Sequence, residues 1–213
     1  MRVSLRIAIF LAALAVLAAL PAQAGAWDRE VAKSYAEQYA LSYNSAFTAY
    51  SGNDCTNFVS QSIWYGGIGM DQDWFYNFAY YFGSGYWINA DLFHNYFKES
   101  YRTHNYRYLL GTYDFHPDSS RPRPPRILST MVRGDIISYD WDLFGGSDWT
   151  MNHVAIVTGK NAHSTLDWDW QGDLTCQHSD DYYRVAWQGG DRYSSTEMRN
   201  WGFAAWGLLT SLW

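Results

Sequence analysis

The stretch that decides the fold is residues 54–61, which read DCTNFVSQ. A turn of sequence SGND leads into it, and Phe58 and Ile63 fall on one side of a helix. A glycine pair that begins at Gly66 is a typical helix end. We therefore expect a helix that starts near Cys55.

The segments on either side of this helix differ in their pattern. Residues 28–50 have apolar side chains at helical spacing behind a candidate N-cap, and residues 71–111 carry further aromatic-rich helical segments. A proline-rich connector, residues 116–125, separates them from a region that reads as strands. The expected strands are residues 136–139, 154–158, 174–178 and 182–187. Helices followed by an antiparallel sheet predict an α+β fold in a single domain.

The first 24 residues have the pattern of an export signal. Arg2 and Arg6 precede an uncharged apolar run, residues 7–20, and small residues at Ala22 and Ala24 suit a signal peptidase. We expect cleavage after Ala24, which leaves residues 25–213 as the mature domain and predicts a secreted or periplasmic protein.

The charge of the mature chain excludes some classes of partner. Without Arg2 and Arg6, 13 of the 15 basic residues remain beside 21 acidic residues in the mature chain, so its formal net charge is −8. An acidic chain without a basic patch is a poor nucleic-acid binder. No second apolar run is long enough to span a membrane. We expect no nucleic-acid partner, no membrane contact after cleavage, and a monomer.

Aromatic residues are frequent, with 12 Trp, 18 Tyr and 11 Phe. Because they are spread along the whole chain, we expect most of them to build the core. Trp64, Trp74 and Trp87 are candidates to border a substrate cleft.

Cys55 lies where a thiol nucleophile would be useful. The free N–H groups and the positive dipole end of a helix stabilise a thiolate at its start. The same N–H groups can bind the oxyanion of an acyl intermediate. Cys55 is therefore the candidate nucleophile, although a cysteine at a helix start is more often a small buried residue.

His153 and His178 are the candidate partners of this thiol. His153 opens an apolar strand, where an imidazole is held rigidly and suits a general base. If the strand that carries His178 is its neighbour, the two rings can share one face, and His178 can orient His153. Asp180, Asp167 and Asn152 compete with His178 for the orienting role.

A disulfide is the main rival to a catalytic Cys55. Cys176 is the second of only two cysteines, and an exported protein with two cysteines commonly pairs them. Cys176 and His178 share a strand face, so a Cys55–Cys176 bond is compatible with the same arrangement and would block the enzyme. The histidines show no zinc-ligand spacing, and no glycine-rich loop has the spacing of a phosphate site, so we expect no metal and no cofactor. Arg133-Gly134-Asp135 is interpreted as a turn into a strand and not as an adhesion motif.

Four blocks of the chain resemble one bacterial family, the Putative amidase domain, which is related to the papain-like NlpC/P60 and CHAP enzymes. The blocks are Ala32–Tyr50, residues 54–61 with Gly66-Gly67, residues 134–141, and residues 153–158 followed by 177–180. They occur in the family's order and span nearly the whole mature chain.

The resemblance implies a papain-like α+β fold with a catalytic cysteine. By position, Cys55 matches the nucleophile, His153 the base, and His178 the third polar residue. An exported enzyme of this type would hydrolyse amide bonds, with peptides of the cell wall (peptidoglycan) as the candidate substrate. An inactive member that binds wall glycan or peptide is the remaining alternative.

Overall fold

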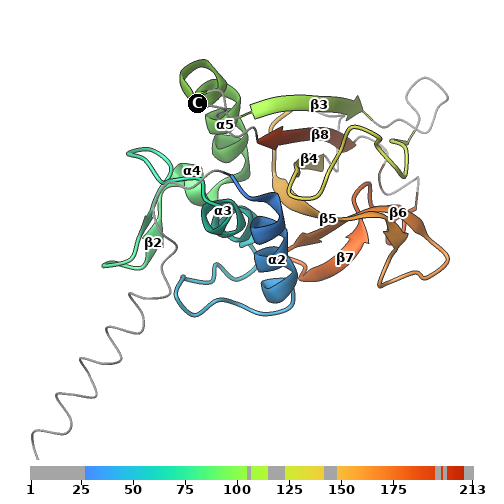
Figure 1. The fold of residues 1–213 in the computed structure, drawn as a ribbon, viewed down its shortest axis with the longest axis horizontal. Coiled ribbons are helices and arrows are strands. Elements are labelled where there is room, and N and C mark those ends of the chain that lie inside the picture. The colour runs from blue at the N-terminus through green and yellow to red at the C-terminus, as the bar shows by residue number, and fades with distance from the viewer. Residues whose placement is uncertain are drawn as a thin grey trace, which may run out of the picture.

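In a computed structural model, the protein is an antiparallel sheet with helices on one face (Figure 1). The structure describes residues 27–104, 107–114, 123–141, 148–194, 198 and 201–208. The helices are α2 (Arg29–Tyr39), α3 (Cys55–Tyr65), α4 (Gly85–Ile88) and α5 (Ala90–His104). The strands are β1 (Tyr76–Asn77), β2 (Phe82–Gly83), β3 (Arg107–Asp114), β4 (Ile136–Trp141), β5 (His153–His163), β6 (Gln171–Gln177), β7 (Tyr182–Ala186) and β8 (Trp201–Leu208). The predicted α+β class is confirmed, and the expected export signal, residues 1–24, lies outside the described residues.

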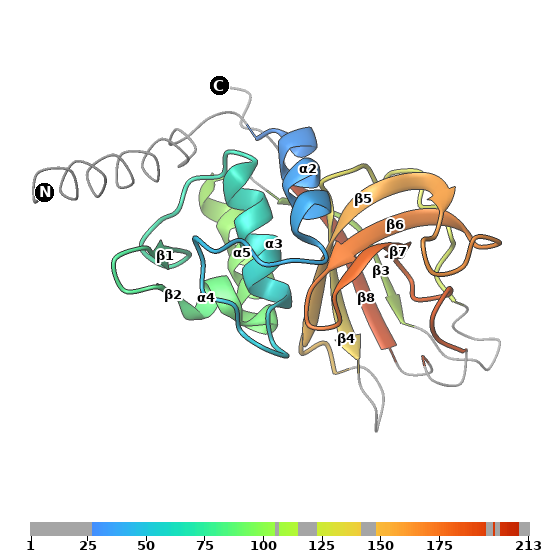
Figure 2. The same cartoon turned by 90° about the horizontal axis from the view of Figure 1, so that it is seen from below.

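The main sheet has six strands in the order β3-β8-β4-β5-β6-β7, and every neighbouring pair is antiparallel. Figure 2 shows α2, α3, α4 and α5 together on one side of it. Alternate residues of a strand point to opposite faces. Val154 and Ile156 pack with the helices in one core cluster, whereas Ala155 and Val157 belong to a second cluster on the far face. Segments before β4 and after β7 cover that far face with Met131 and Trp187 among others.

Helix α3 begins at Cys55 and is followed by Gly66, as predicted. Its first nine residues are all buried, because the helix lies between the sheet and the other helices. Its polar side chains are satisfied there: Asn57 Oδ1 accepts a hydrogen bond from Trp87 Nε1 at 2.8 Å, and Ser60 Oγ accepts one from Trp74 Nε1 at 3.1 Å. Trp74 and Trp87 are fully buried, so the expectation that they border a cleft is wrong.

Helix α2 is shorter than the predicted helix over residues 28–50. It is capped as expected, since the carboxylate of Asp28 accepts the backbone N–H groups of Glu30 and Val31. It ends at Tyr39, and a loop follows in which Asn44 Oδ1 accepts the N–H of Ala46 at 3.0 Å. Such side-chain bonds to the backbone compete with helix formation.

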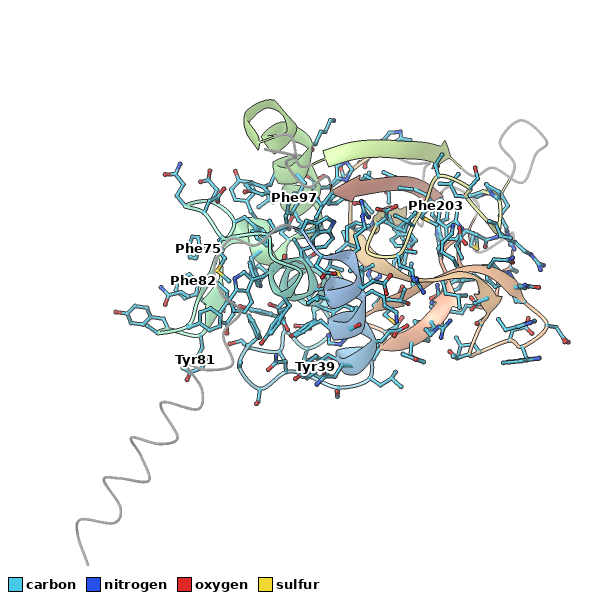
Figure 3. All side chains as sticks on the ribbon, in the orientation of Figure 1. Tyr39, Phe75, Tyr81, Phe82, Phe97 and Phe203 are labelled. Carbon is cyan, nitrogen blue, oxygen red and sulfur yellow. The ribbon has the colours of Figure 1, made fainter. Side chains whose placement is uncertain are left out.

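Four of the strands were not expected from the pattern. Part of the aromatic-rich region forms the small hairpin β1–β2 and the edge strand β3 in place of helix, and β8 lies between β3 and β4 near the end of the chain. Strand β8 is buried along its whole length, so it has no polar face to give an alternating pattern. Figure 3 shows Tyr81 at the β1–β2 hairpin pointing away from the molecule, whereas Phe97 and Phe203 lie inside.

Candidate functional site

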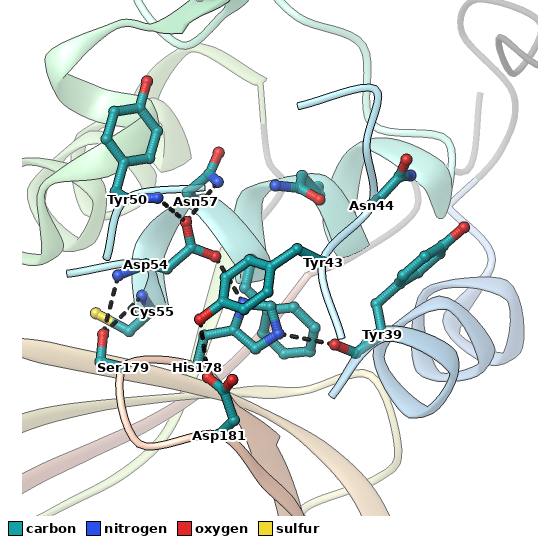
Figure 4. Close-up of polar contacts among 12 residues, drawn as sticks. Tyr39, Tyr43, Asn44, Tyr50, Asp54, Cys55, Asn57, His178, Ser179 and Asp181 are labelled. Atoms are coloured by element: carbon teal, nitrogen blue, oxygen red, sulfur yellow. Dashed lines mark hydrogen bonds and ion pairs between the residues drawn. The ribbon is translucent and has the colours of Figure 1, made fainter. Parts of the chain in front are cut away.

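Cys55 is the first residue of α3, and 6% of its surface is exposed. Its sulfur lies 3.7 Å from Thr56 Oγ1. The residue before it, Asp54, is buried and accepts hydrogen bonds on Oδ1 from Tyr50 N at 2.8 Å and from Asn57 Nδ2 at 2.9 Å. These contacts hold the Asp54 carboxylate beside the nucleophile position (Figure 4).

The backbone N–H groups at the start of α3 meet Ser179. Asp54 N donates to Ser179 Oγ at 2.9 Å, and Cys55 N donates to the same oxygen at 3.2 Å. Ser179 lies in the turn after β6 with a φ of 85°, a conformation that costs energy for a residue other than glycine. The turn therefore brings an oxygen atom to two N–H groups of the helix N-terminus.

His178 lies beside Asp54 and has an acceptor at each ring nitrogen. Nδ1 is 2.6 Å from Asp54 Oδ2, and Nε2 is 2.8 Å from the carbonyl oxygen of Tyr39. A carbonyl oxygen can only accept, so Nε2 carries a hydrogen, and a second proton lies between Nδ1 and the carboxylate. The ring is stacked on Phe58 at 4.1 Å, and the ring of Tyr43 lies over it at 4.6 Å (Figure 4). His178 is thus oriented by Asp54 on the side of the sheet that carries α3.

His153 lies on the opposite face of the sheet from Cys55. Its cross-strand partner is Tyr139, which belongs to the far-face cluster, and its ring stacks on Trp141 at 4.1 Å. Burial lowers the pKa of His153 to about 3, and the nearby charge of Arg192 acts in the same direction, while a hydrogen bond with Gln177 opposes them. This histidine is neutral at physiological pH and is not brought to the thiol.

The expectation that His153 and His178 share a face is wrong, and the register explains why. Ile156 pairs with Cys176 and Val157 pairs with Thr175, so the antiparallel alignment brings Val154, not His153, level with His178. A shift of one residue exchanges the two faces of a strand. The structure therefore brings His178 to Asp54, the residue before Cys55, and leaves His153 on the far face.

Both cysteines are free thiols in this structure, without the alternative Cys55–Cys176 disulfide. Cys176 does lie in the same core cluster as Cys55, as its shared face with His178 predicts. Its sulfur is 3.3 Å from Thr158 Oγ1, and burial raises its pKa to about 11.

The carboxylate that orients His178 is not among the residues predicted from the sequence. Asp180, Asp167 and Asn152 are expected to compete with His178 in orienting His153, whereas the structure shows His178 itself bound to Asp54. Asp54 was interpreted only as a turn residue, and its place directly before Cys55 is the signal that could have identified it. Ser179 was likewise missed, although it follows His178 directly. Within the described ranges, no group of three His, Cys, Asp or Glu residues is arranged to hold a metal ion.

Comparison with known proteins gives the family of the chain. It is 29% identical over 174 residues to the Bacillus subtilis protein YjcM, a match that covers 79% of this chain and 36% of that protein. The chain thus spans little more than a third of the length of this relative, and no solved structure matches it. In the part of the chain that the structure describes, no helix has the length and apolar character needed to cross a bilayer. The family model described as the Putative amidase domain matches residues 26–201, which contain the whole Asp54, Cys55 and His178 cluster, and the chain belongs to that family.

Proposed function

We propose that this protein hydrolyses amide bonds with Cys55 as the nucleophile and His178, paired with Asp54, as the acid–base group. The observation that carries the proposal is the contact of 2.6 Å between His178 and the carboxylate of the residue that directly precedes Cys55. A nucleophile, a base and a group that orients the base are the three parts that thiol catalysis needs. The family resemblance predicts His153 as the base, but the geometry favours His178.

The proposed reaction consumes one water and releases an acid and an amine. Once free of Tyr39, His178 Nε2 releases its hydrogen to water as a proton; the ring then accepts the proton of the Cys55 thiol, and the thiolate forms a bond to the amide carbon. The carbonyl electron pair moves to oxygen, where the N–H groups of Asp54 and Cys55 can stabilise it in place of Ser179 Oγ. The C–N bond then breaks as His178 protonates the amine, and water hydrolyses the thioester and restores the thiol.

The substrate and location that we propose follow from the sequence. The N-terminal pattern supports export with cleavage after Ala24, and an exported amidase related to the papain-like NlpC/P60 enzymes would find amide bonds in cell-wall peptides. The family match supports the class of reaction.

The test compares three variants for release of primary amine from muropeptides and from a panel of N-acetylated dipeptide amides. Cys55→Ser and His178→Asn should each lose at least about 100-fold in kcat, since nucleophile and acid–base group are both required. His153→Gln, a neutral replacement on the far face, should stay within a few-fold of wild type.

The same experiment can refute the assignment. Full turnover by Cys55→Ser would exclude a thiol mechanism. If His153→Gln loses turnover and His178→Asn keeps it, the general base is His153 and not His178. Circular dichroism of each variant separates a catalytic loss from unfolding.

A binding module without turnover is the second candidate, because Cys55 is nearly buried and His178 already has partners at both nitrogens. Calorimetric binding of a muropeptide by wild type, with no amine released over a day, would favour it.

A further inference from the structure

The segment 39–54, here called the strap, runs from the last residue of α2 to the residue before α3 and passes over His178. Its two ends supply both acceptors of the imidazole, Tyr39 through its carbonyl and Asp54 through its carboxylate. Tyr43, near the start of the strap, covers one face of the ring, and Phe58 of α3 covers the other. Both nitrogens and both faces of His178 are therefore occupied.

This arrangement is incompatible with proton transfer at Nε2. A nitrogen that donates to Tyr39 O has no free lone pair, so it cannot accept the thiol proton of Cys55 while that contact lasts. The N–H groups of Asp54 and Cys55 are occupied as well, by Ser179 Oγ. The polar groups that catalysis would use all have internal partners.

Each half of the strap is hydrogen-bonded to the helix beside it, and in the half near α2 Asn44 Nδ2 donates to Tyr35 Oη at 3.0 Å. The half near α3 is hydrogen-bonded to α3 and to the β1–β2 hairpin. The carbonyl oxygen of Thr48 accepts from Asn57 Nδ2 at 2.9 Å, and the N–H of Thr48 donates to Tyr76 Oη at 2.7 Å. In the half near α2, Leu41 is 66% and Tyr43 is 42% exposed. Tyr43 Oη donates to Asp181 Oδ1 at 3.2 Å, across to the turn that carries His178.

The Tyr43 phenol is suited to act as a latch. Desolvation and the charge of Asp181 raise the pKa of Tyr43 to about 12, so the hydroxyl keeps its hydrogen and donates throughout the physiological range. The bond joins the half of the strap near α2 to the β6–β7 turn. Without this bond the Tyr43 ring can move away from His178.

We propose that the strap is an autoinhibitory closure of the site, with the contact between Tyr43 and Asp181 as its latch. In the closed form His178 is held by Tyr39 and covered by Tyr43. When the half of the strap near α2 opens, Nε2 loses its contact with the Tyr39 carbonyl and releases its proton to water, and His178 can then accept the thiol proton of Cys55. The inference rests on the proposed function, since it concerns the regulation of the same site.

The test uses Tyr43→Phe in the full chain, which removes the latch hydroxyl and keeps the ring. Tyr80→Phe, at a tyrosine that is 77% exposed on the β1–β2 hairpin, is the matched control. The first readout is the rate of alkylation of Cys55 by iodoacetamide, located by mass spectrometry, because only the thiolate reacts. The second readout is amine release from the muropeptide and dipeptide amide panel. A hydrogen bond of this kind raises the ratio of closed to open form by about five-fold. Both rates should therefore rise about five-fold in Tyr43→Phe and stay unchanged in Tyr80→Phe.

The outcomes separate this inference from the proposed function. Faster alkylation of Cys55 in Tyr43→Phe without amine release by any variant supports the strap and refutes the amidase. Amine release that depends on Cys55, with both rates in Tyr43→Phe at or below wild type, refutes the strap and keeps the amidase. Asp181→Ala removes the other half of the latch and should reproduce the increase; its failure to do so would refute the latch.

Discussion

At the scale of single residues, His178 and His153 show how surroundings decide what an imidazole can do. His178 faces an acceptor at each ring nitrogen, whereas His153 is buried against aromatic rings, where its charged form is disfavoured. The first is suited to exchange protons beside Cys55. The second is suited to support the far-face core as a neutral ring.

The burial of His153 predicts a specific loss of stability in acid. Its pKa is about 3 in the folded protein and 6.5 for a free side chain, so between these values the unfolded chain binds the extra proton. The contribution of neutral His153 to the free energy of unfolding is complete above pH 6.5 and is lost as the pH falls towards 3. Between pH 7 and 5 the free energy of unfolding should fall by about 2 kcal/mol from this group alone.

Urea denaturation at a series of pH values measures this loss. His153→Gln should lack it and show a shallower fall than wild type, whereas His163→Gln, at an exposed histidine, should keep the wild-type slope. Equal slopes for wild type and His153→Gln would contradict the buried neutral state.

At the scale of elements, the end of α3 depends on close approach to the start of the domain. A Cβ at Gly66 would lie 2.3 Å from a ring carbon of Trp27 and 2.9 Å from the Cβ of Ala32, so only glycine fits there. The carbonyl of Gly66 also accepts the N–H of Asp28 at 2.7 Å. These contacts join the end of α3 to the N-terminal end of α2.

Gly66→Ala should therefore destabilise the protein by about 1–3 kcal/mol, the usual cost of overpacking a core. Gly69→Ala is the matched control, since a Cβ there meets nothing within 4 Å, and it should change stability by no more than about 0.5 kcal/mol. Chemical denaturation of both variants measures the difference, and similar stabilities would contradict the close contact.

At the scale of the whole molecule, Arg29 joins the helical layer to two strands of the sheet. Its guanidinium forms an ion pair with the fully buried Asp135, just before β4, and donates to the carbonyl of Leu208 at the end of β8 at 2.7 Å. Asp135 also accepts the N–H of Val132 at 2.8 Å, which closes the turn into β4. These contacts support a structural role for Arg133-Gly134-Asp135.

The two arginines at this place should differ in their effect on stability. Arg29→Ala leaves the Asp135 charge buried with fewer partners and should cost about 3–5 kcal/mol. Arg133→Ala removes only a half-exposed ion pair with Glu30 and should cost no more than about 1 kcal/mol. Thermal unfolding of the two variants tests the ranking; a larger loss for Arg133→Ala would contradict it.

Several features of the protein could be predicted from its sequence alone. The start of α3 at Cys55, its end at Gly66, the strands β4 to β7 and the α+β class all follow from local patterns: turn residues, helical spacing and apolar runs. Each of these signals lies within about ten residues of the feature that it predicts. The candidate nucleophile could be identified because its setting at a helix start is local.

Which histidine lies beside the start of α3 was decided only by the tertiary structure. Which of His153 and His178 lies on the face of the sheet that carries α3 depends on how β5 and β6 are aligned, and one residue of register exchanges the faces of a strand. The place of β8 between β3 and β4 is likewise a pairing of distant segments. Such pairings arise from packing across the whole sheet, so no local pattern specifies them, and Asp54 became a site residue only when the turn after β6 brought His178 to it.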